Sequence, residues 1–194
     1  MPRQSTARTD MLRSAALLFR EKGVEATSVA DVIEHAHAPR GSIYHHFPGG
    51  RPQLVEEATR GAGDVMGSMI ASGLASRGPE HTMASIVGSF RDQLVATDHA
   101  AGCPVGAAAV EGPNTPGARD AAGAAFTSWE KIIAESLCER GVTRDDAERA
   151  ATLALSAIEG ALLMCKAQRS TRPLDVVEQW LVGMMADLLG TASR

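Results

Sequence analysis

The sequence predicts an all-α protein, with an N-terminal three-helix helix-turn-helix domain, a C-terminal helical domain and about nine helices in all. Apolar residues recur at helical spacing through almost every segment, and no segment alternates as a strand would. Only 4% of the residues are aromatic, while alanine and glycine are plentiful. This composition favours close helix packing over an aromatic-rich β core.

The first helix is predicted over residues 6–22, with Met11, Ala15 and Phe19 on one face and Gly23 just past its end. Ser28 then has the character of an N-cap, and Asp31, three residues later, completes a pattern similar to a capping box. A short second helix is therefore expected to begin after Ser28.

A third helix is expected over about residues 39–46, because the fixed φ of Pro39 suits a first helical turn. A helix, a short helix, a four-residue turn and another short helix make the helix-turn-helix plan, whose last helix enters the DNA major groove. The start of that helix needs an arginine and small polar groups, which Arg40, Gly41 and Ser42 supply. Arg40 can bond bidentately to a guanine edge.

Further residues of the N-terminal region are suited to positioning a DNA backbone. The phenol of Tyr44 and the imidazoles of His45 and His46 are phosphate donors, and the start of the second helix is a natural anion site. The remaining predicted contacts are Thr27, Ser28 and Arg51, with Arg3 and Arg8 as a short basic arm. A metal site at the histidine pair is disfavoured, because adjacent residues on a helix point about 100° apart.

The charge distribution agrees with this interpretation. The net charge is −4. Residues 1–51 carry 7 Lys/Arg and 5 Asp/Glu, a balance of +2, and the remainder carries 12 and 18, a balance of −6. We predict a DNA-binding domain over residues 1–50 and a ligand-binding and dimerisation domain over residues 51–194.

Two runs in the N-terminal region resemble the signature of the tetracycline-repressor (TetR) family, residues 27–33 (TSVADVI) and 40–47 (RGSIYHHF). Residues 48–50 (PGG) and 102–105 (GCPV) further resemble the multidrug-sensing subgroup that includes LmrA and QacR-like repressors. The resemblance implies a DNA-binding head, a helical ligand-binding body, a homodimer, and loss of operator affinity when a small molecule fills the body.

Carried over by position, Thr27, Tyr44 and Arg51 match the family's phosphate contacts, and residues 40–42 match its base-reading positions. His37 stands where the family usually has glycine, at a position that often needs a positive φ. Pro39 replaces the usual serine or threonine. These departures concern the geometry of the turn.

Long helices are expected in the rest of the chain, over about residues 51–76, 80–97, 116–140, 144–168 and 173–189, with a break at Gly78-Pro79. Their large apolar residues are candidates for a pocket that takes a small hydrophobic or amphipathic ligand, although a plain core is an open alternative for each. The candidates are Met66, Met69, Met83, Phe90, Phe126 and Trp129.

The last two helices are predicted to form a two-fold, four-helix dimer contact, through small residues on one and apolar residues on the other. The candidates are Ala154, Ala157, Ala161, Trp180, Met184 and Leu188. The alternative is that both helices only close the core of one chain. A two-fold dimer predicts a roughly palindromic operator.

The leading hypothesis is a cytoplasmic, ligand-released repressor of double-stranded operator DNA, without metal, cofactor or membrane span. One alternative is an activator, or a regulator controlled by a partner protein. A remote alternative is an enzyme that uses Cys103 in the helical body, although no base and orienting acid stand at a suitable spacing. The three cysteines are widely spaced and suggest neither a disulfide framework nor a zinc site.

Overall fold

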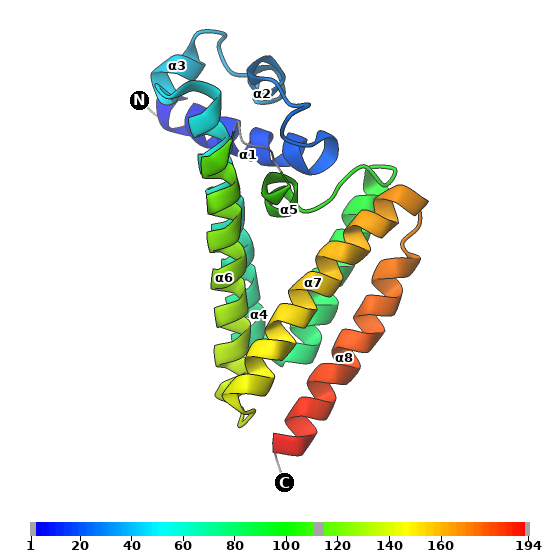
Figure 1. Cartoon of the computed structure of the whole chain (residues 1–194). Helices are drawn as coiled ribbons and strands as arrows, with labels where there is room; N and C mark the ends of the chain where they lie inside the picture. The colour runs from blue at the N-terminus through cyan, green and yellow to red at the C-terminus, as the bar shows by residue number, and fades with distance from the viewer. Residues whose placement is uncertain (1–2, 111–114, 193–194) are drawn as a thin grey trace. The chain divides into compact units, whose positions relative to one another are not determined.

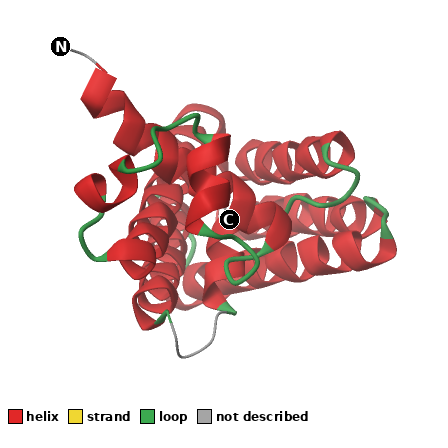
Figure 2. Cartoon of the chain, turned by 90° about the horizontal axis from the view of Figure 1, so that it is seen from above, coloured by secondary structure: helices red, strands yellow, loops and turns green. Residues whose placement is uncertain are grey.

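The computed structural model describes residues 3–110 and 115–192, with side chains from residue 7 onward, and in these parts of the chain it contains eight helices and no strand (Figures 1 and 2). The helices are α1 (Arg3–Lys22), α2 (Val29–His35), α3 (Ser42–His46), α4 (Gly50–Ala96), α5 (Pro104–Ala109), α6 (Pro116–Cys138), α7 (Arg144–Gln168) and α8 (Arg172–Ala192). The all-α prediction is confirmed.

The chain forms two compact units. The first, here called the head, comprises Met1–Val65 and Cys103–Ala125, and the second, here called the body, comprises Met66–Gly102 and Phe126–Arg194. The helices α4 and α6 each contribute residues to both units. The head therefore extends beyond the helix-turn-helix itself, since α5 and the start of α6 belong to it.

The head is built around α1. Met11, Ala15 and Phe19 are at most 1% exposed, as their helical spacing predicts. The helix ends at Gly23, whose φ of 88° lets its N–H bond back to the carbonyl of Phe19 at 2.9 Å. Ser14 Oγ lies 2.9 Å from His35 Nδ1, which joins α1 to α2.

The other helices of the head approach α1 or one another closely. The short helix α5 packs against α1. In α4, a Cβ on Gly63 would lie only 2.7 Å from Ala125 Cβ, so this glycine allows α4 and α6 to approach each other. These contacts explain why residues 103–125 belong to the head.

The long helix α4 is broken once, at the position that the sequence predicts. Gly78 has φ 81° and ψ 173°, a conformation that only glycine adopts readily, and Pro79 follows it. Gly78 still accepts a hydrogen bond, at 2.6 Å, from the hydroxyl of Thr82. Two helical segments therefore stand in place of one straight rod.

In the body, α7 and α8 lie side by side (Figure 1). Thr143 caps α7 by accepting the N–H of Asp146 at 3.2 Å, as the sequence predicts. Arg91 of α4 holds α8 through ion pairs to Glu178 and, at 2.7 Å, to Asp175. The hydrogen bond to Glu178, followed by that to Asp175, raises the pKa of Arg91 despite its partial burial.

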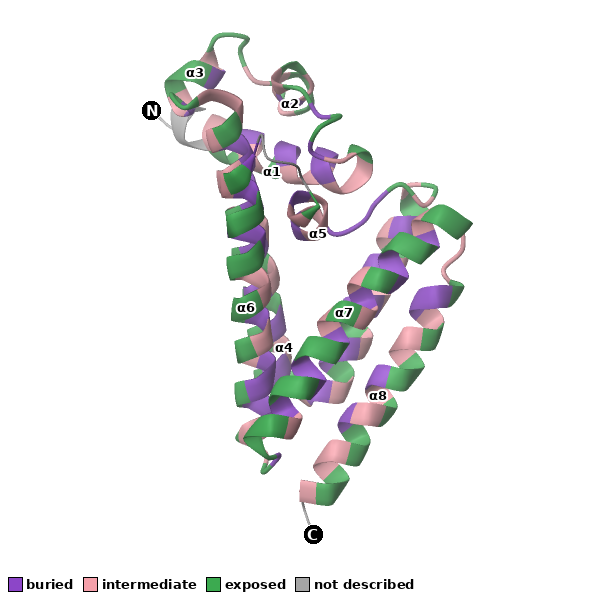
Figure 3. Ribbon diagram, viewed as in Figure 1, coloured by how far each residue is buried: buried purple, intermediate pink, exposed green. Residues whose placement is uncertain are grey.

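The helix α7 has a buried face and an exposed apolar face (Figure 3). Leu153, Leu163 and Met164 are 51–68% exposed, and the small residues Ser156 and Gly160 lie on the same stripe. Among the described residues, α7 is the one helix long and apolar enough to cross a membrane by length and composition alone. Apolar core helices pass the same test, and the most apolar 18-residue window of α7 is 39% buried in its own chain.

Candidate nucleic-acid interface and ligand cavity

The capping box at the start of α2 forms as predicted. Ser28 Oγ accepts the N–H of Asp31 at 3.1 Å, while Asp31 Oδ2 accepts the N–H of Ser28 at 2.8 Å and its hydroxyl at 2.7 Å. The hydrogen bonds from the Ser28 side chain and backbone lower the pKa of Asp31. The carboxylate thus takes two donors that the sequence analysis assigns to a phosphate.

Thr27 and Arg51 tie the α1–α2 turn to the start of α4. The hydroxyl of Thr27 is donated inward to the carbonyl of Gly23 at 2.7 Å, and the residue is 2% exposed. The Arg51 guanidinium donates to the carbonyls of Val24 at 2.6 Å and Thr27 at 3.4 Å. Thr27 therefore supports the turn from within, and Arg51 has part of its donor capacity engaged before any DNA is present.

The third helix, α3, begins at Ser42, three residues later than the sequence predicts. The carbonyl of Pro39 accepts both the N–H of Ser42 at 3.0 Å and its hydroxyl at 2.7 Å, so Pro39 lies in a turn that precedes the helix. His37, with φ 49°, adopts the positive φ that the sequence analysis expects at this position. Because the Ser42 hydroxyl donates internally, its oxygen remains available chiefly as an acceptor.

The two sides of α3 differ in character. Ile43 and Phe47, one helical turn apart, are 2% and 0% exposed and face the core of the head. Arg40, Tyr44 and His45 are exposed, Tyr44 to 71%. An arginine and a phenol therefore project from the start of a helix held against the head by its apolar side.

The predicted histidine pair lies near the end of α3. The His45 and His46 rings meet edge to face, with centroids 5.1 Å apart. Within the described residues, no group of three or more His, Cys, Asp or Glu side chains is placed to hold a metal ion. The exposed His45 ring and the partly exposed His46 ring are polar groups at the rim of the candidate DNA-reading surface.

A second candidate site lies within the body, where apolar residues from α4, α6 and α7 surround a cavity of about 20 Å³. Four predicted pocket residues line it, namely Met66, Met83, Phe90 and Trp129. Met69 is instead 49% exposed, and Phe126 packs edge to face on Trp129 with ring centroids 5.3 Å apart. The volume is that of about one water molecule, so a ligand would have to displace side chains.

Six further residues line the cavity and were not predicted from the sequence, namely Ile70, Ile86, Ile133, Leu155, Ile158 and Glu159. Ile70 and Ile133 follow Met66 and Trp129 by one helical turn, a spacing that would have identified them. Glu159 is the only charged residue of the lining. The cavity therefore combines an apolar wall with one carboxylate.

The dimer candidates fall into two groups. Ala154 and Ala161 are 0% and 3% exposed, because the small-residue face of α7 packs inside its own chain. Trp180 is 53% exposed and lies with Met184 and Leu188 along an open groove on α8. The exposed apolar surface of α7 is the stripe through Leu153, which the sequence analysis does not include.

Cys103 has a structural place. It is the N-cap of α5, where its sulfur accepts the N–H of Gly106 at 3.3 Å, and it is 6% exposed. Cys165 is buried as well, and burial raises the pKa of its thiol. A raised pKa disfavours the thiolate that nucleophilic chemistry requires.

The helix-turn-helix and its exposed polar face define a DNA-binding regulator. Residues 11–58 match the family described as bacterial regulatory proteins, tetR family, and residues 79–180 match the C-terminal domain of LmrA/YxaF-like transcriptional regulators. The chain therefore belongs to the TetR family, with an LmrA/YxaF-like C-terminal domain. It is a DNA-binding transcriptional regulator and not an enzyme.

Individual proteins agree with this membership. The chain is 39% identical over 193 residues to the HTH-type transcriptional regulator Rv0196 of Mycobacterium tuberculosis, which covers 96% of this chain and 98% of that protein. A TetR regulatory protein from Rhodobacter sphaeroides shares the fold with a TM-score of 0.80 at 19% identity, covering 92% of this chain and 98% of that one. A cysteine mutant of the TetR-family regulator CifR was solved with 26-bp double-strand operator DNA. It shares the fold with a TM-score of 0.71 at 23% identity, over 89% of this chain and 94% of that one.

Proposed function

We propose that the protein is a homodimeric repressor that reads a palindromic operator through α3 and releases it when a small molecule binds in the body. The observation that carries the proposal is that α3 and its flanking residues have one buried apolar side and one exposed polar side. Ile43 and Phe47 are buried, and Arg40 and Tyr44 are exposed. Such a helix presents polar groups to a groove while its apolar side stays in the head.

Within this surface the residues have different roles. Arg40 precedes α3 and offers a guanidinium that matches the two acceptors of a guanine edge. Ser42 offers an acceptor to a base amino group, since its proton goes to Pro39. Tyr44, His45 and His46 donate to phosphates, as Arg51 does with the donor capacity that remains. Ser28 gives both of its donors to Asp31 and acts by capping α2. Gly41 lets the backbone approach the DNA closely. Thr27 does not contact the DNA but stabilises the α1–α2 turn through its hydrogen bond to Gly23.

The dimer is proposed to form through the exposed faces of α7 and α8. On α7, Leu153, Leu163 and Met164 flank small residues that allow another helix to come close. On α8, Val176 and Trp180 are 54% and 53% exposed. Such a concentration of exposed apolar side chains on two adjacent helices is what a four-helix contact between two copies would cover.

The ligand is proposed to be a small hydrophobic or amphipathic molecule that enters the body cavity. Its lining is apolar apart from Glu159, and the methionines Met66 and Met83 can change rotamer to make room. Because the cavity is nearly filled, the ligand would stabilise a rearranged state. It releases DNA only if that state binds the operator less well. We place the protein in the cytoplasm, where its DNA is.

The test is to select duplexes from a random library with the purified protein and then to measure the mass of the protein–DNA complex in solution. The proposal predicts an enriched palindrome with two chains, or a multiple of two, per duplex. It also predicts that a compound from a screen of small apolar molecules releases the duplex. An asymmetric site bound by one chain would contradict the dimer, and release only by another protein would favour the partner-controlled regulator.

A further inference from the structure

The recognition helix α3 is too short to hold its own position. It has five residues, and helices of this length are unstable in isolation because nucleation is costly. Its orientation must therefore come from contacts with neighbouring elements. Ile43 and Phe47 bury its apolar side, and such apolar contacts carry no direction of their own.

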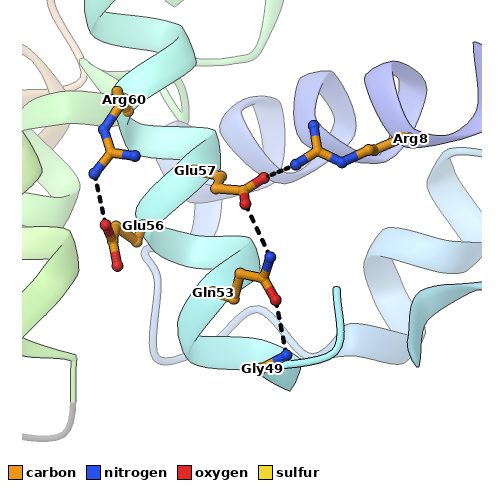
Figure 4. A network of polar contacts seen from close by, with 6 residues as sticks. All are labelled: Arg8, Gly49, Gln53, Glu56, Glu57 and Arg60. Carbon is orange, nitrogen blue, oxygen red and sulfur yellow. Dashed lines mark hydrogen bonds and ion pairs between the residues drawn. The ribbon is translucent and has the colours of Figure 1, made fainter. Parts of the chain in front are cut away.

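A chain of polar contacts holds the turn that follows α3 (Figure 4). The N–H of Gly49 donates to Gln53 Oε1 at 2.7 Å, and Gln53 Nε2 donates to Glu57 Oε1 at 2.9 Å. The other carboxylate oxygen of Glu57 accepts an ion-paired hydrogen bond from Arg8 of α1. Glu57 thus connects α1, the first turns of α4 and the turn that leaves α3.

Arg8 also contacts the residue that follows α3, which is Phe47. The guanidinium carbon of Arg8 lies 5.2 Å from the centroid of the Phe47 ring, and Phe47 is the C-cap of α3. Arg8 thus contacts the ring of Phe47, the C-cap of α3. Gln53 accepts the backbone N–H of Gly49, two residues later. The side chains of Arg8 and Glu57 are 43% and 23% exposed, which limits screening at the carboxylate.

We propose that Glu57 and Arg8 are positioning residues of the recognition helix, which fix the orientation of α3 on α4 without touching DNA. This inference rests on the proposed reading of DNA by α3. It changes the role of Arg8, which the sequence alone places in a basic arm against the DNA backbone. It also makes the first two turns of α4 the element that sets how α3 is presented.

The adjacent ion pair provides a matched control. Glu56 accepts from Arg60 at 2.6 Å, one turn further along the same helix (Figure 4). Both partners lie on α4, so the pair has no connection to α3. Substitution of Glu56 or Glu57 by alanine removes the same charge and one ion pair from the same helix. Only the Glu57 change breaks the path to α3.

The protein contains a built-in reporter, because Tyr44 is its single tyrosine and lies on the exposed side of α3. We would label the full-length protein with 3-fluorotyrosine and record its ¹⁹F NMR spectrum. A narrow resonance is expected for the wild type and for Glu56→Ala. Glu57→Ala should broaden, split or shift it, while Glu57→Gln, whose amide oxygen still accepts hydrogen bonds, should restore part of the wild-type signal.

DNA binding supplies a second readout, with a library-selected duplex and an unrelated duplex as probes. Glu57→Ala and Arg8→Ala should weaken binding to the selected duplex by up to about tenfold, because a smaller fraction of the protein holds α3 in the binding orientation, and leave binding to the unrelated duplex unchanged. The slope of log affinity against log salt should stay constant for Arg8→Ala. If Arg8 contacts a phosphate, the slope falls by about one.

An unchanged ¹⁹F resonance with unchanged affinity in Glu57→Ala would overturn the inference, and a reduced salt slope would overturn it for Arg8. If Glu57→Ala does not fold, the same comparison is made with Glu57→Gln against Glu56→Gln. If Arg40→Ala and Tyr44→Phe bind the selected duplex as the wild type does, the proposed role of α3 itself fails. If those two weaken binding and the Glu57 variants do not, only the positioning inference fails.

Discussion

The head and the body of this regulator use opposite kinds of side chain for their functions. In the head, a small apolar centre around Met11 and Phe19 supports polar groups nearer the surface, and hydrogen bonds hold some of them in place, as at the partly exposed Arg51 and Glu57. In the body, apolar side chains from three helices surround a nearly filled cavity, and further apolar groups remain exposed on α7 and α8.

The difference reflects the ligands that each unit is proposed to take. DNA requires charge and directional donors at fixed positions, and fixed positions come from hydrogen-bonded networks. A small apolar ligand requires space that can open, and adaptable side chains such as Met66 and Met83 provide it. The head is therefore expected to tolerate few changes on its DNA-reading surface, and the body few changes in its interior.

The largest effect on stability should follow the truncation of a buried side chain in the body. Met83→Ala removes a side chain that is 1% exposed and lines the cavity, so the free energy of unfolding should fall by about 2–5 kcal/mol. Met69→Ala, at a half-exposed site on the same helix, should change it by about 0.5 kcal/mol or less. Urea unfolding of the two variants measures the contrast, and equal losses would mean that the body has no distinct interior here.

In the head, the corresponding loss should appear in binding and not in stability. Arg40→Ala removes the proposed guanine contact and should weaken binding to the selected duplex by about 1–3 kcal/mol, while the unfolding midpoint stays unchanged. Arg60→Ala removes the same charge from an exposed site on α4 and should bind nearly as the wild type. A titration of fluorescently labelled duplex gives both affinities, and equal affinities would refute the assignment.

The break in α4 gives a test of opposite signs within one helix. Gly78→Ala should destabilise the protein by about 1–3 kcal/mol, because a residue with a Cβ is strained at φ 81° and ψ 173°. Gly88→Ala, at a helical position with open space around it, should stabilise by about 0.5–1 kcal/mol. Thermal unfolding of the two variants tests this, and a stable Gly78→Ala would mean that the break is not required.

The smallest effect concerns a device that both units share. In the head, Ser28 lowers the pKa of Asp31, and in the body Thr143, followed by Arg149, lowers the pKa of Asp146. Each carboxylate therefore stabilises the fold above the ordinary aspartate pKa of about 4. Each loses this contribution as the pH falls through its folded-state pKa.

Asp31→Asn and Asp146→Asn should each lower the free energy of unfolding at neutral pH, and the difference from the wild type should shrink as the pH falls below about 4. Urea unfolding at a series of pH values measures it. A pH-independent difference would show that the charge of the carboxylate is not what stabilises these helix starts.

Features that depend on neighbouring residues could be predicted from the sequence. The capping pairs at Ser28 and Thr143 and the break at Gly78 follow from the chemistry of a few consecutive side chains. The start of α3 at Ser42 did not, because Pro39 suits both a first helical turn and the turn before it. Only the hydrogen bond from Ser42 decides between them.

Features that depend on distant contacts could not be predicted. Arg51 bonds to carbonyls 24 and 27 residues away, and Arg8 pairs with Glu57 across 49 residues, so the sequence assigned both arginines to DNA. On α7, both the alanine stripe and the leucine stripe are apolar. Periodicity does not say that Ala154 faces inward and Leu153 outward.

The most direct test of the central claim, that α3 reads DNA, is a salt titration of binding to the selected duplex and to an unrelated duplex, for the wild type and for Tyr44→Phe. We expect tight binding to the selected duplex alone, weakening steeply with salt, and weaker binding by Tyr44→Phe with no loss of stability. Equal and weak binding to both duplexes, or full affinity in Tyr44→Phe and Arg40→Ala alike, would contradict the account.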